Sequence, residues 1–285
     1  MKRAIVTGGT KSDVAAMGVL AINIRDTNAD LFDKLIIYHD GISKKDQEVI
    51  GSIFPTVFYR YKLPYKSRND EIVNHFSPMV FCKFECFKLL QEFDEVVWTD
   101  YDVVILKSLS DGLDFEKSCF NYMRGSISLR NMFFKDIINK EIFTFDLDQL
   151  AFHASFFAMS SQMPGYMEIY KECYKKAEEW DLDIYLPEQC VFAALLQKYN
   201  VDTSYLDEKK YSCIPEEKND EAVILHAMGQ PKFWNGRSNT DWNKRYKEWC
   251  LIGGRKYNNR KHLLQRKMKF IWTRICGMRG REINS

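Results

Sequence analysis

Short apolar runs alternate with helix-like segments through residues 3–61, and this alternation restricts the possible folds more than any other feature of the sequence. A strand that is followed by a helix and then by another strand needs a crossover connection, which places the two strands parallel. The expected strands cover residues 3–7, 35–38 and 56–61, and the expected helices cover residues 14–24 and 43–53. The sequence therefore predicts an α/β fold with a mostly parallel, Rossmann-like central sheet that is flanked by helices.

The rest of the chain continues this mixture of strands and helices. An amphipathic helix is expected over residues 80–93, because its apolar residues follow helical spacing. Further strands are expected at residues 96–98, 119–123, 153–159 and 222–225, helices at 165–180 and 190–196, and an irregular basic loop at 124–142.

Two carboxylates, Asp100 and Asp102, follow the apolar residues 96–98 at the expected end of a buried strand. Ligands of open α/β sheets bind at the carboxyl ends of the strands. Apolar residues lie on both sides of the two acids, and a buried carboxylate is costly unless a cation neutralises it. A hard divalent ion that also binds phosphates is one such cation. The alternative is an ordinary strand-to-turn junction, in which Asp100 caps the turn and Asp102 is solvated.

A second candidate segment is the expected strand at 222–225 and the turn after it. His226 stands at the end of this strand, and Gly229 belongs to a turn that would return Lys232 to the same edge of the sheet. One imidazole and two carboxylates leave room for phosphate oxygens around Mn²⁺ or Mg²⁺, and Lys232 would neutralise the remaining phosphate charge. A histidine at a strand end is otherwise usually a structural residue.

Charged residues also occur in two apolar helices. Lys83 lies in the apolar stretch VFCKFECF, where its ammonium group could pair with an aspartate and reach a phosphate. The alternative for Lys83 is a side chain that extends to the surface. Glu188 and Gln189 open the expected helix at 190–196, where an acid in the first turn also simply complements the helix dipole.

Together these residues resemble the family 8 glycosyltransferases, the retaining group that includes glycogenin and bacterial lipooligosaccharide galactosyltransferases. The resemblance extends from about residue 3 to about residue 236. It rests on Asp100-Tyr101-Asp102 at a strand end, on the preceding helix with Lys83, and on the later pattern His226-x-x-Gly229-x-x-Lys232-x-Trp234.

The resemblance implies a GT-A fold, a UDP-sugar donor and a divalent metal, Mn²⁺ or Mg²⁺, held between the protein and the diphosphate. The implied metal ligands are Asp100, Asp102 and His226. The implied donor-binding residues are Thr7, Gly8, Asp100, Tyr101, Asp102, His153, Ala154, Gly229 and Lys232. The implied catalytic residues are Lys83 near the donor phosphates and sugar, and Glu188 and Gln189 near the anomeric carbon.

The chain departs from the family pattern in three places. The family usually has a tyrosine in the first loop that stacks on uracil, but residues 8–13 contain none. His153 and Ser155 stand where the family often has Asn and Gly around the donor sugar, and Phe233 replaces a usual proline. These departures leave the contacts to the base and the identity of the donor sugar open.

The activity that the resemblance implies is metal-dependent transfer of a hexose, galactose or glucose or their N-acetyl forms, to a glycan or lipid-linked saccharide with retention of configuration. One alternative is a sugar nucleotidyltransferase, although the N-terminal segment has no glycine-rich pyrophosphate loop with a basic signature. Another alternative is a non-enzymatic peripheral membrane protein with a degenerate nucleotide site.

The charge of the chain is unevenly distributed. Of 41 Lys and Arg residues, ten lie within residues 255–285, where Glu282 is the one acid; elsewhere 31 basic residues face 38 acidic ones. Apolar residues in this tail recur at 264, 268, 271, 275 and 278. Such a basic amphipathic helix favours attachment to an anionic membrane surface, and docking on the protein body or binding of nucleic acid is the alternative. We therefore expect a catalytic domain over residues 1–250 and a membrane-attachment tail over residues 251–285, without a nucleic-acid partner.

The composition fits a globular protein, since 46% of the 285 residues are hydrophobic. No run of about 18 apolar residues is present, and the N-terminus enters a strand directly, so a cytoplasmic protein is expected, peripheral on the inner face of the membrane at most. The eight cysteines form no Cys-x-x-Cys pair and are expected to be reduced core residues.

Overall fold

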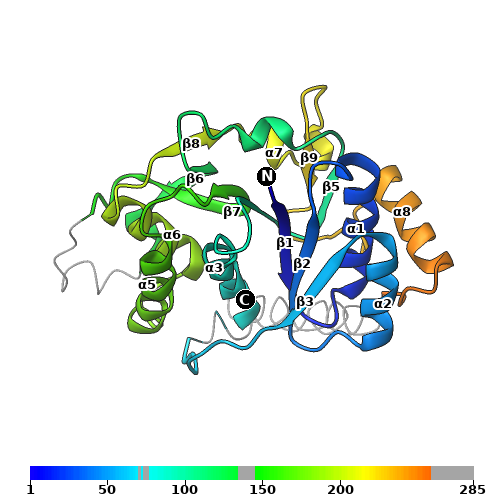
Figure 1. Cartoon of the computed structure of the whole chain (residues 1–285), viewed down its shortest axis with the longest axis horizontal. Helices are drawn as coiled ribbons and strands as arrows, with labels where there is room; N and C mark the ends of the chain where they lie inside the picture. Colours follow the sequence, from blue (N-terminus) through cyan, green and yellow to red (C-terminus); the bar gives the residue numbers. More distant parts are fainter. Residues whose placement is uncertain (70–71, 73–76, 134–144, 258–285) are drawn as a thin grey trace, which may run out of the picture.

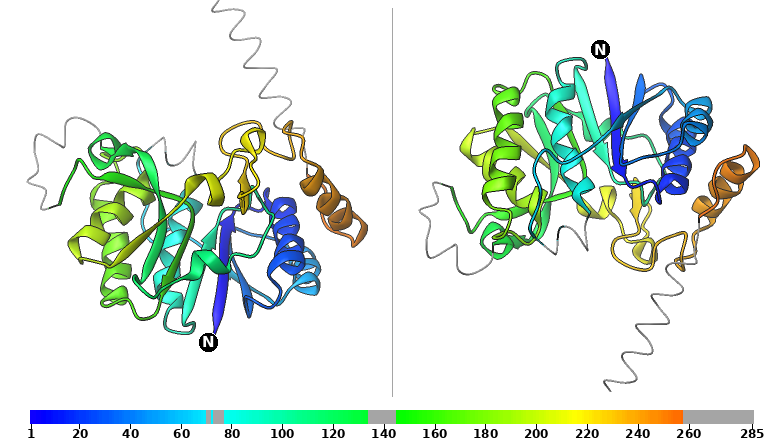
Figure 2. Two further views of the ribbon diagram at one scale, coloured as in Figure 1. Left: turned by 90° about the horizontal axis from the view of Figure 1, so that it is seen from above. Right: turned by 90° about the horizontal axis from the view of Figure 1, so that it is seen from below.

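The computed structural model describes residues 1–69, 72, 77–133 and 145–257. A seven-stranded sheet lies between two layers of helices (Figure 1). One layer contains α1 (Val14–Asn28), α2 (Lys44–Ile53) and α8 (Thr240–Leu251). The other layer contains the 3₁₀ helix η2 (Pro78–Phe84), α3 (Glu85–Leu89), α5 (Tyr166–Glu179) and α6 (Pro187–Lys198). In Figure 2, the orange α8 lies outside the blue α1, on the side of the sheet opposite α5 and α6.

The strand order of the main sheet is β3-β2-β1-β4-β7-β6-β8. The strands are β1 (Arg3–Gly9), β2 (Lys34–His39), β3 (Thr56–Arg60), β4 (Glu95–Thr99), β6 (Phe120–Ser128), β7 (Leu150–Ser160) and β8 (Thr203–Leu206). Strands β1 to β4 pair in parallel, as do β6 and β8, whereas β7 is antiparallel to both β4 and β6. The mostly parallel sheet is therefore confirmed.

A small second sheet pairs β5 (Val103–Ile105) with β9 (Ile224–His226) in antiparallel orientation. It connects two segments that are far apart in the sequence. The remaining short helical elements are η3 (Ser110–Leu113), η4 (Leu129–Met132), α7 (Glu208–Tyr211) and η5 (Pro215–Glu217).

Successive residues of the parallel strands face opposite helical layers. Ile5 and Val97 belong to the core on the α1 and α2 side, whereas Val6 and Val96 belong to the core on the α3, α5 and α6 side, and all four are fully buried. Because both faces are covered, the strands are continuous apolar runs instead of alternating apolar and polar residues. This is why short apolar runs located them in the sequence.

The prediction of one amphipathic helix over residues 80–93 is wrong for much of this segment. Residues 78–84 form a 3₁₀ helix, and only residues 85–89 are α-helical. Phe81, Phe84 and Phe87 are all fully buried, so packing from several sides decides the geometry of this segment.

The basic loop expected at 124–142 is also partly wrong. Residues 124–128 extend β6, because they pair with β7, which the sequence did not indicate as their partner. Residues 134–142 lie outside the described residues.

The last described residues, up to Tyr257, still contact the protein body. Trp249 of α8 is fully buried, and its Nε1 donates to the Arg255 carbonyl at 2.9 Å. Arg255 also forms an ion pair with Asp46 of α2. The apolar stripe expected at 264–278 lies outside the described residues.

The described cysteines are all unpaired thiols, as expected, and six of them are buried. None of the helices in the described ranges combines the length and the apolar character that a membrane-spanning helix needs.

Candidate active site

Asp100 and Asp102 lie in the connection between β4 and β5. The backbone N–H of Asp100 donates to the Ser155 carbonyl at 2.9 Å, and Trp98 Nε1 donates to Asp100 Oδ1 at 3.0 Å. The Asp102 carbonyl accepts from the backbone N–H of Ala227 at 2.9 Å. The connection is thus held from both sides, by β7 and by the residue after β9.

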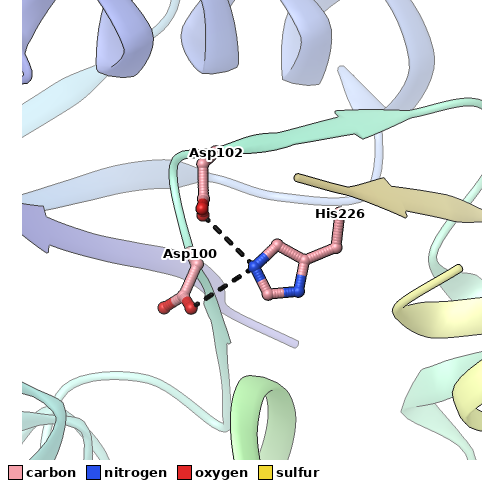
Figure 3. A group of neighbouring side chains, drawn as sticks. All are labelled: Asp100, Asp102 and His226. Carbon is pink, nitrogen blue, oxygen red and sulfur yellow. Dashed lines mark ion pairs between the residues drawn. The ribbon is translucent and has the colours of Figure 1, made fainter. Parts of the chain in front are cut away.

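His226 reaches the two carboxylates because β9 pairs with β5. In this small sheet His226 is the partner of Val103, the residue after Asp102. Its Nε2 lies 3.4 Å from Asp102 Oδ1 and 4.0 Å from Asp100 Oδ2 (Figure 3). The three ligand atoms all lie within 4.8 Å of one another. Residues more than a hundred positions apart therefore meet at one point, at the carboxyl end of β4.

Ser212 fixes the orientation of the histidine ring. Its hydroxyl lies 2.9 Å from Nδ1 of His226, and both side chains are buried. The Ser212 hydroxyl is also 3.3 Å from that of Ser155, which in turn is 3.3 Å from Nδ1 of His153. With Nδ1 engaged by Ser212, Nε2 is the ring nitrogen that faces the carboxylates. Sequence reasoning missed Ser212, because it belongs to no local motif.

Lys83 joins the carboxylates to the start of α6. It is 6% exposed, and its Nζ lies 2.9 Å from Glu188 Oε1 and 3.6 Å from Asp100 Oδ1. Burial alone would lower the pKa of Lys83, but the carboxylates of Asp100 and Glu188 outweigh it and raise the pKa above its usual value. Lys83 is therefore a permanently charged group at the candidate site and not a surface side chain.

Lys232 returns to the same edge of the sheet. The turn before it contains Gly229, whose φ of 69° lies in the left-handed region that favours glycine. The ammonium group of Lys232 forms an ion pair with Asp102 and donates to the Ala227 carbonyl at 2.8 Å. Burial would raise the pKa of Asp102, but His226 and Lys232 together outweigh it and lower the pKa. Asp102 is thus held ionised.

Tyr101 lies against the first loop and not beside the carboxylates. Its ring stacks with that of Trp234 at 6.1 Å, and a Cβ atom at Gly9 would be 2.7 Å from it. Gly8 approaches η2 even more closely, since a Cβ there would be 2.3 Å from Cys82 Sγ. Close packing accounts for the two glycines. The Thr7 side chain is fully buried, and its hydroxyl has no hydrogen-bond partner among the described residues.

The remaining candidate residues lie on β7 and α6. The His153 ring lies 6.4 Å from that of His226, and burial, with the nearby His226 and Lys83, lowers the pKa of His153 to about 4. Ala154 is 1% exposed and enclosed within β7. Gln189 is half-buried in the first turn of α6, next to Glu188.

The group formed by Asp100, Asp102 and His226 has the chemistry of a divalent metal site. Carboxylate oxygens and imidazole nitrogens suit Mn²⁺ and Mg²⁺. Ligands at about 2.1 Å from one octahedral ion lie about 3 to 4 Å apart, which is the spacing found here between Nε2 and the two carboxylates. The donor atoms and these two separations therefore fit such an ion.

Residues 4–238 match the sequence profile described as Glycosyl transferase family 8. The chain belongs to this family. The match covers β1, both carboxylates, His226 and Lys232, which are the segments that form the candidate site. This family 8 chain is thus a glycosyltransferase. A comparison with curated proteins gave no match.

Solved structures support the fold of this family 8 protein. An active-site Gln-to-Glu mutant of LgtC is 14% identical, with a TM-score of 0.63, over 87% of this chain and 95% of LgtC. The galactosyltransferase LgtC in complex with donor and acceptor sugar analogs is 16% identical, with a TM-score of 0.57, over 88% of this chain and 95% of that chain. GlyE from Streptococcus pneumoniae is 18% identical, with a TM-score of 0.56, over 88% of this chain and 64% of GlyE. At these identities the structures show a common fold, which is the expected GT-A fold.

Proposed function

We propose that this family 8 glycosyltransferase transfers a hexose, galactose or glucose or an N-acetyl form of either, from a UDP-sugar to a saccharide or glycolipid acceptor. The observation that carries the proposal is the convergence of Asp100, Asp102 and His226. The similar LgtC is a galactosyltransferase that was solved with donor and acceptor sugar analogs, which supports the substrate class.

The same three residues would hold Mn²⁺ or Mg²⁺. Such an ion, when bound, acts as a Lewis acid toward the negative charge of the departing diphosphate. Lys232 adds a positive charge at this place, since its ammonium group already lies against Asp102. Lys83 supplies a second fixed cation on the opposite carboxylate, Asp100. Preorganised cations of this kind stabilise a leaving group without reorganisation during the reaction.

Retention of configuration would follow from attack of the acceptor on the face that the diphosphate leaves, without a protein nucleophile. The two residues proposed to lie near the anomeric carbon, Glu188 and Gln189, favour this route. Glu188 is only 2% exposed and its carboxylate is engaged by Lys83, so it is poorly placed to be a nucleophile. Gln189 is a neutral amide and a weak nucleophile, although a glutamine also belongs to the active site of the similar LgtC. The acceptor hydroxyl would therefore attack on the side that the diphosphate leaves, and a diphosphate oxygen would accept its proton.

A panel of UDP-sugars, each supplied with Mn²⁺ or with a chelator, tests this activity. We expect metal-dependent release of UDP from one donor as its hexose passes to water, and NMR recorded before the free hexose mutarotates should show the anomeric configuration of the donor. Inversion would eliminate the same-face route. A requirement for a nucleoside triphosphate and a sugar phosphate would instead indicate a nucleotidyltransferase.

For Asp102→Asn we expect loss of the metal-dependent turnover, because the carboxylate that faces both His226 and Lys232 becomes neutral. Full activity of this variant would contradict the assignment of the metal site.

The basic tail has a separate proposed role, namely attachment of a cytoplasmic enzyme to the inner face of the membrane. This proposal rests on the ten basic residues within 255–285. Because Arg255 still contacts Asp46, the truncation should follow Tyr257, so that the contacts of the body remain intact. The shortened protein should no longer sediment with vesicles of phosphatidylserine at low salt. Unchanged sedimentation would contradict the role of the tail.

A further inference from the structure

A cavity of about 640 Å³ lies between the edge strand β3 and the helices α3 and α5. Its volume is within the range of small-molecule sites. Five tyrosines belong to its lining, together with charged residues of both signs. The tyrosines are Tyr38, Tyr59, Tyr61, Tyr170 and Tyr174.

The tyrosines on the strand side form a stacked aromatic surface. The rings of Tyr38 and Tyr59 stack at 5.5 Å, and Tyr61 meets Tyr38 edge-on at 6.3 Å. Tyr59 is 38% exposed, so one part of this surface is open to a ligand. Rigid aromatic rings with a polar end bind ligands that have both an apolar face and hydroxyl groups.

Glu85 gives the helix side a fixed acceptor. The hydroxyls of Tyr170 and Tyr174 donate to its Oε1 at 3.0 and 2.6 Å, and Tyr174 also lies 3.2 Å from the Tyr61 hydroxyl. No hydrogen bond of Oε2 occurs within the described part of the chain. A carboxylate that is held in place and keeps a free oxygen can accept hydrogen bonds from neighbouring hydroxyls of a ligand.

The cavity is distinct from the proposed donor site, although both use the segment from η2 to α3. Lys83 extends toward Asp100 and Glu188, whereas Glu85, only two residues later, extends toward the tyrosines. Cys82, which precedes Lys83, is fully buried against Gly8. The two sites therefore use different side chains of one buried segment, and the cavity lining includes none of Lys83, Asp100 and Glu188.

We propose that this cavity is a second binding site, which takes a neutral saccharide. The pyranose ring would lie on the tyrosines, and its hydroxyls would meet Glu85. Arg60, Lys62 and Lys88 are balanced in part by Glu85 and Glu92, so the lining lacks the concentrated positive charge that a nucleotide requires. The proposal goes beyond the glycosyl transfer described above, because it needs neither a donor nor a metal.

Saturation-transfer NMR on the full-length protein tests the proposal. Maltotriose, cellotriose and lactose serve as probes at millimolar concentration, without nucleotide or metal. We expect saturation transfer to at least one of them. Tyr59→Ala should weaken its binding up to about tenfold through loss of stacking, and Glu85→Gln by about tenfold through loss of the charged acceptor.

Two controls make the result decisive. Tyr185→Ala removes a tyrosine that is 44% exposed but lies outside this cavity, and it should leave binding unchanged. Asp102→Asn alters the proposed donor site and should also leave binding unchanged. Absence of transfer to all three probes would overturn the proposal. Binding that is lost in Asp102→Asn but kept in Tyr59→Ala would overturn it too, and would assign the saccharide to the catalytic site.

Discussion

At the scale of single residues, the buried pair of Lys83 and Glu188 supports both the fold and the candidate site. Glu188 is 2% exposed, so removal of Lys83 would leave a buried carboxylate with no cation. We expect Lys83→Met to lower the free energy of unfolding by about 3–5 kcal/mol, as measured by urea denaturation. Lys88→Met is the matched control, because Lys88 is exposed on α3 and its replacement should change stability by less than about 0.5 kcal/mol. Equal losses in both variants would show that the buried pair has no special role.

Ser212 is the residue for which the hydrogen bonds make the clearest prediction about metal binding. Its hydroxyl engages Nδ1 of His226, and loss of such a partner typically weakens metal affinity about 10- to 100-fold. We expect this loss for Ser212→Ala, measured by Mn²⁺ electron paramagnetic resonance without nucleotide. Ser155→Ala should have a smaller effect, because Ser155 contacts Ser212 and not the ring of His226. Wild-type Mn²⁺ affinity in Ser212→Ala would refute the positioning role of Ser212. It would not contradict the metal site itself, which the Asp102→Asn variant tests.

At the scale of elements, the docking of α8 on α1 depends on a glycine. The Trp249 ring lies so close to Gly18 that a Cβ atom there would be 2.3 Å from it. Alanine normally improves a helix by about 1 kcal/mol over glycine, but Gly18→Ala should lower stability by about 1–3 kcal/mol through overpacking. Gly51→Ala in α2 meets nothing within 4 Å and should be neutral or stabilising by up to about 1 kcal/mol. Thermal unfolding of both variants tests the contrast. Stabilisation by both substitutions would contradict the packing.

The elements also show how far local sequence determines this fold. β1, α1, β2, α2 and β3 follow from residues 3–61, because each is an apolar run or an amphipathic period that can be recognised without its neighbours. The antiparallel orientation of β7 cannot be predicted from its own residues, since it depends on pairing with β4, more than fifty residues earlier. The 3₁₀ geometry of η2 was missed because the apolar residues of this segment follow helical spacing, and that spacing did not indicate that packing from several sides favours a 3₁₀ helix.

At the scale of the whole molecule, the candidate site exists only where distant segments meet. Their positions at expected strand ends, and then the resemblance to a family, pointed to Asp100, Asp102 and His226, but the contact itself depends on the pairing of β5 with β9. Ser212 could not be found in this way, because it reaches His226 through the parallel bridge between Cys213 and Leu225. A serine in an ordinary segment carries no signal until that bridge is known.

This dependence predicts how ligands change the stability of the whole chain. A metal and a diphosphate that bind together between β4 and β9 bind the folded state and not the unfolded chain. They therefore raise the free energy of unfolding by about 2.7 kcal/mol when the ligand concentration is a hundred times Kd. UDP with Mn²⁺ should therefore raise Tm by roughly 5 °C, whereas UDP with a chelator should raise it far less. Asp102→Asn should abolish the difference, because it neutralises the carboxylate nearest His226. An equal rise with UDP and chelator would mean that the nucleotide binds without the metal, and that the carboxylates and His226 serve another purpose.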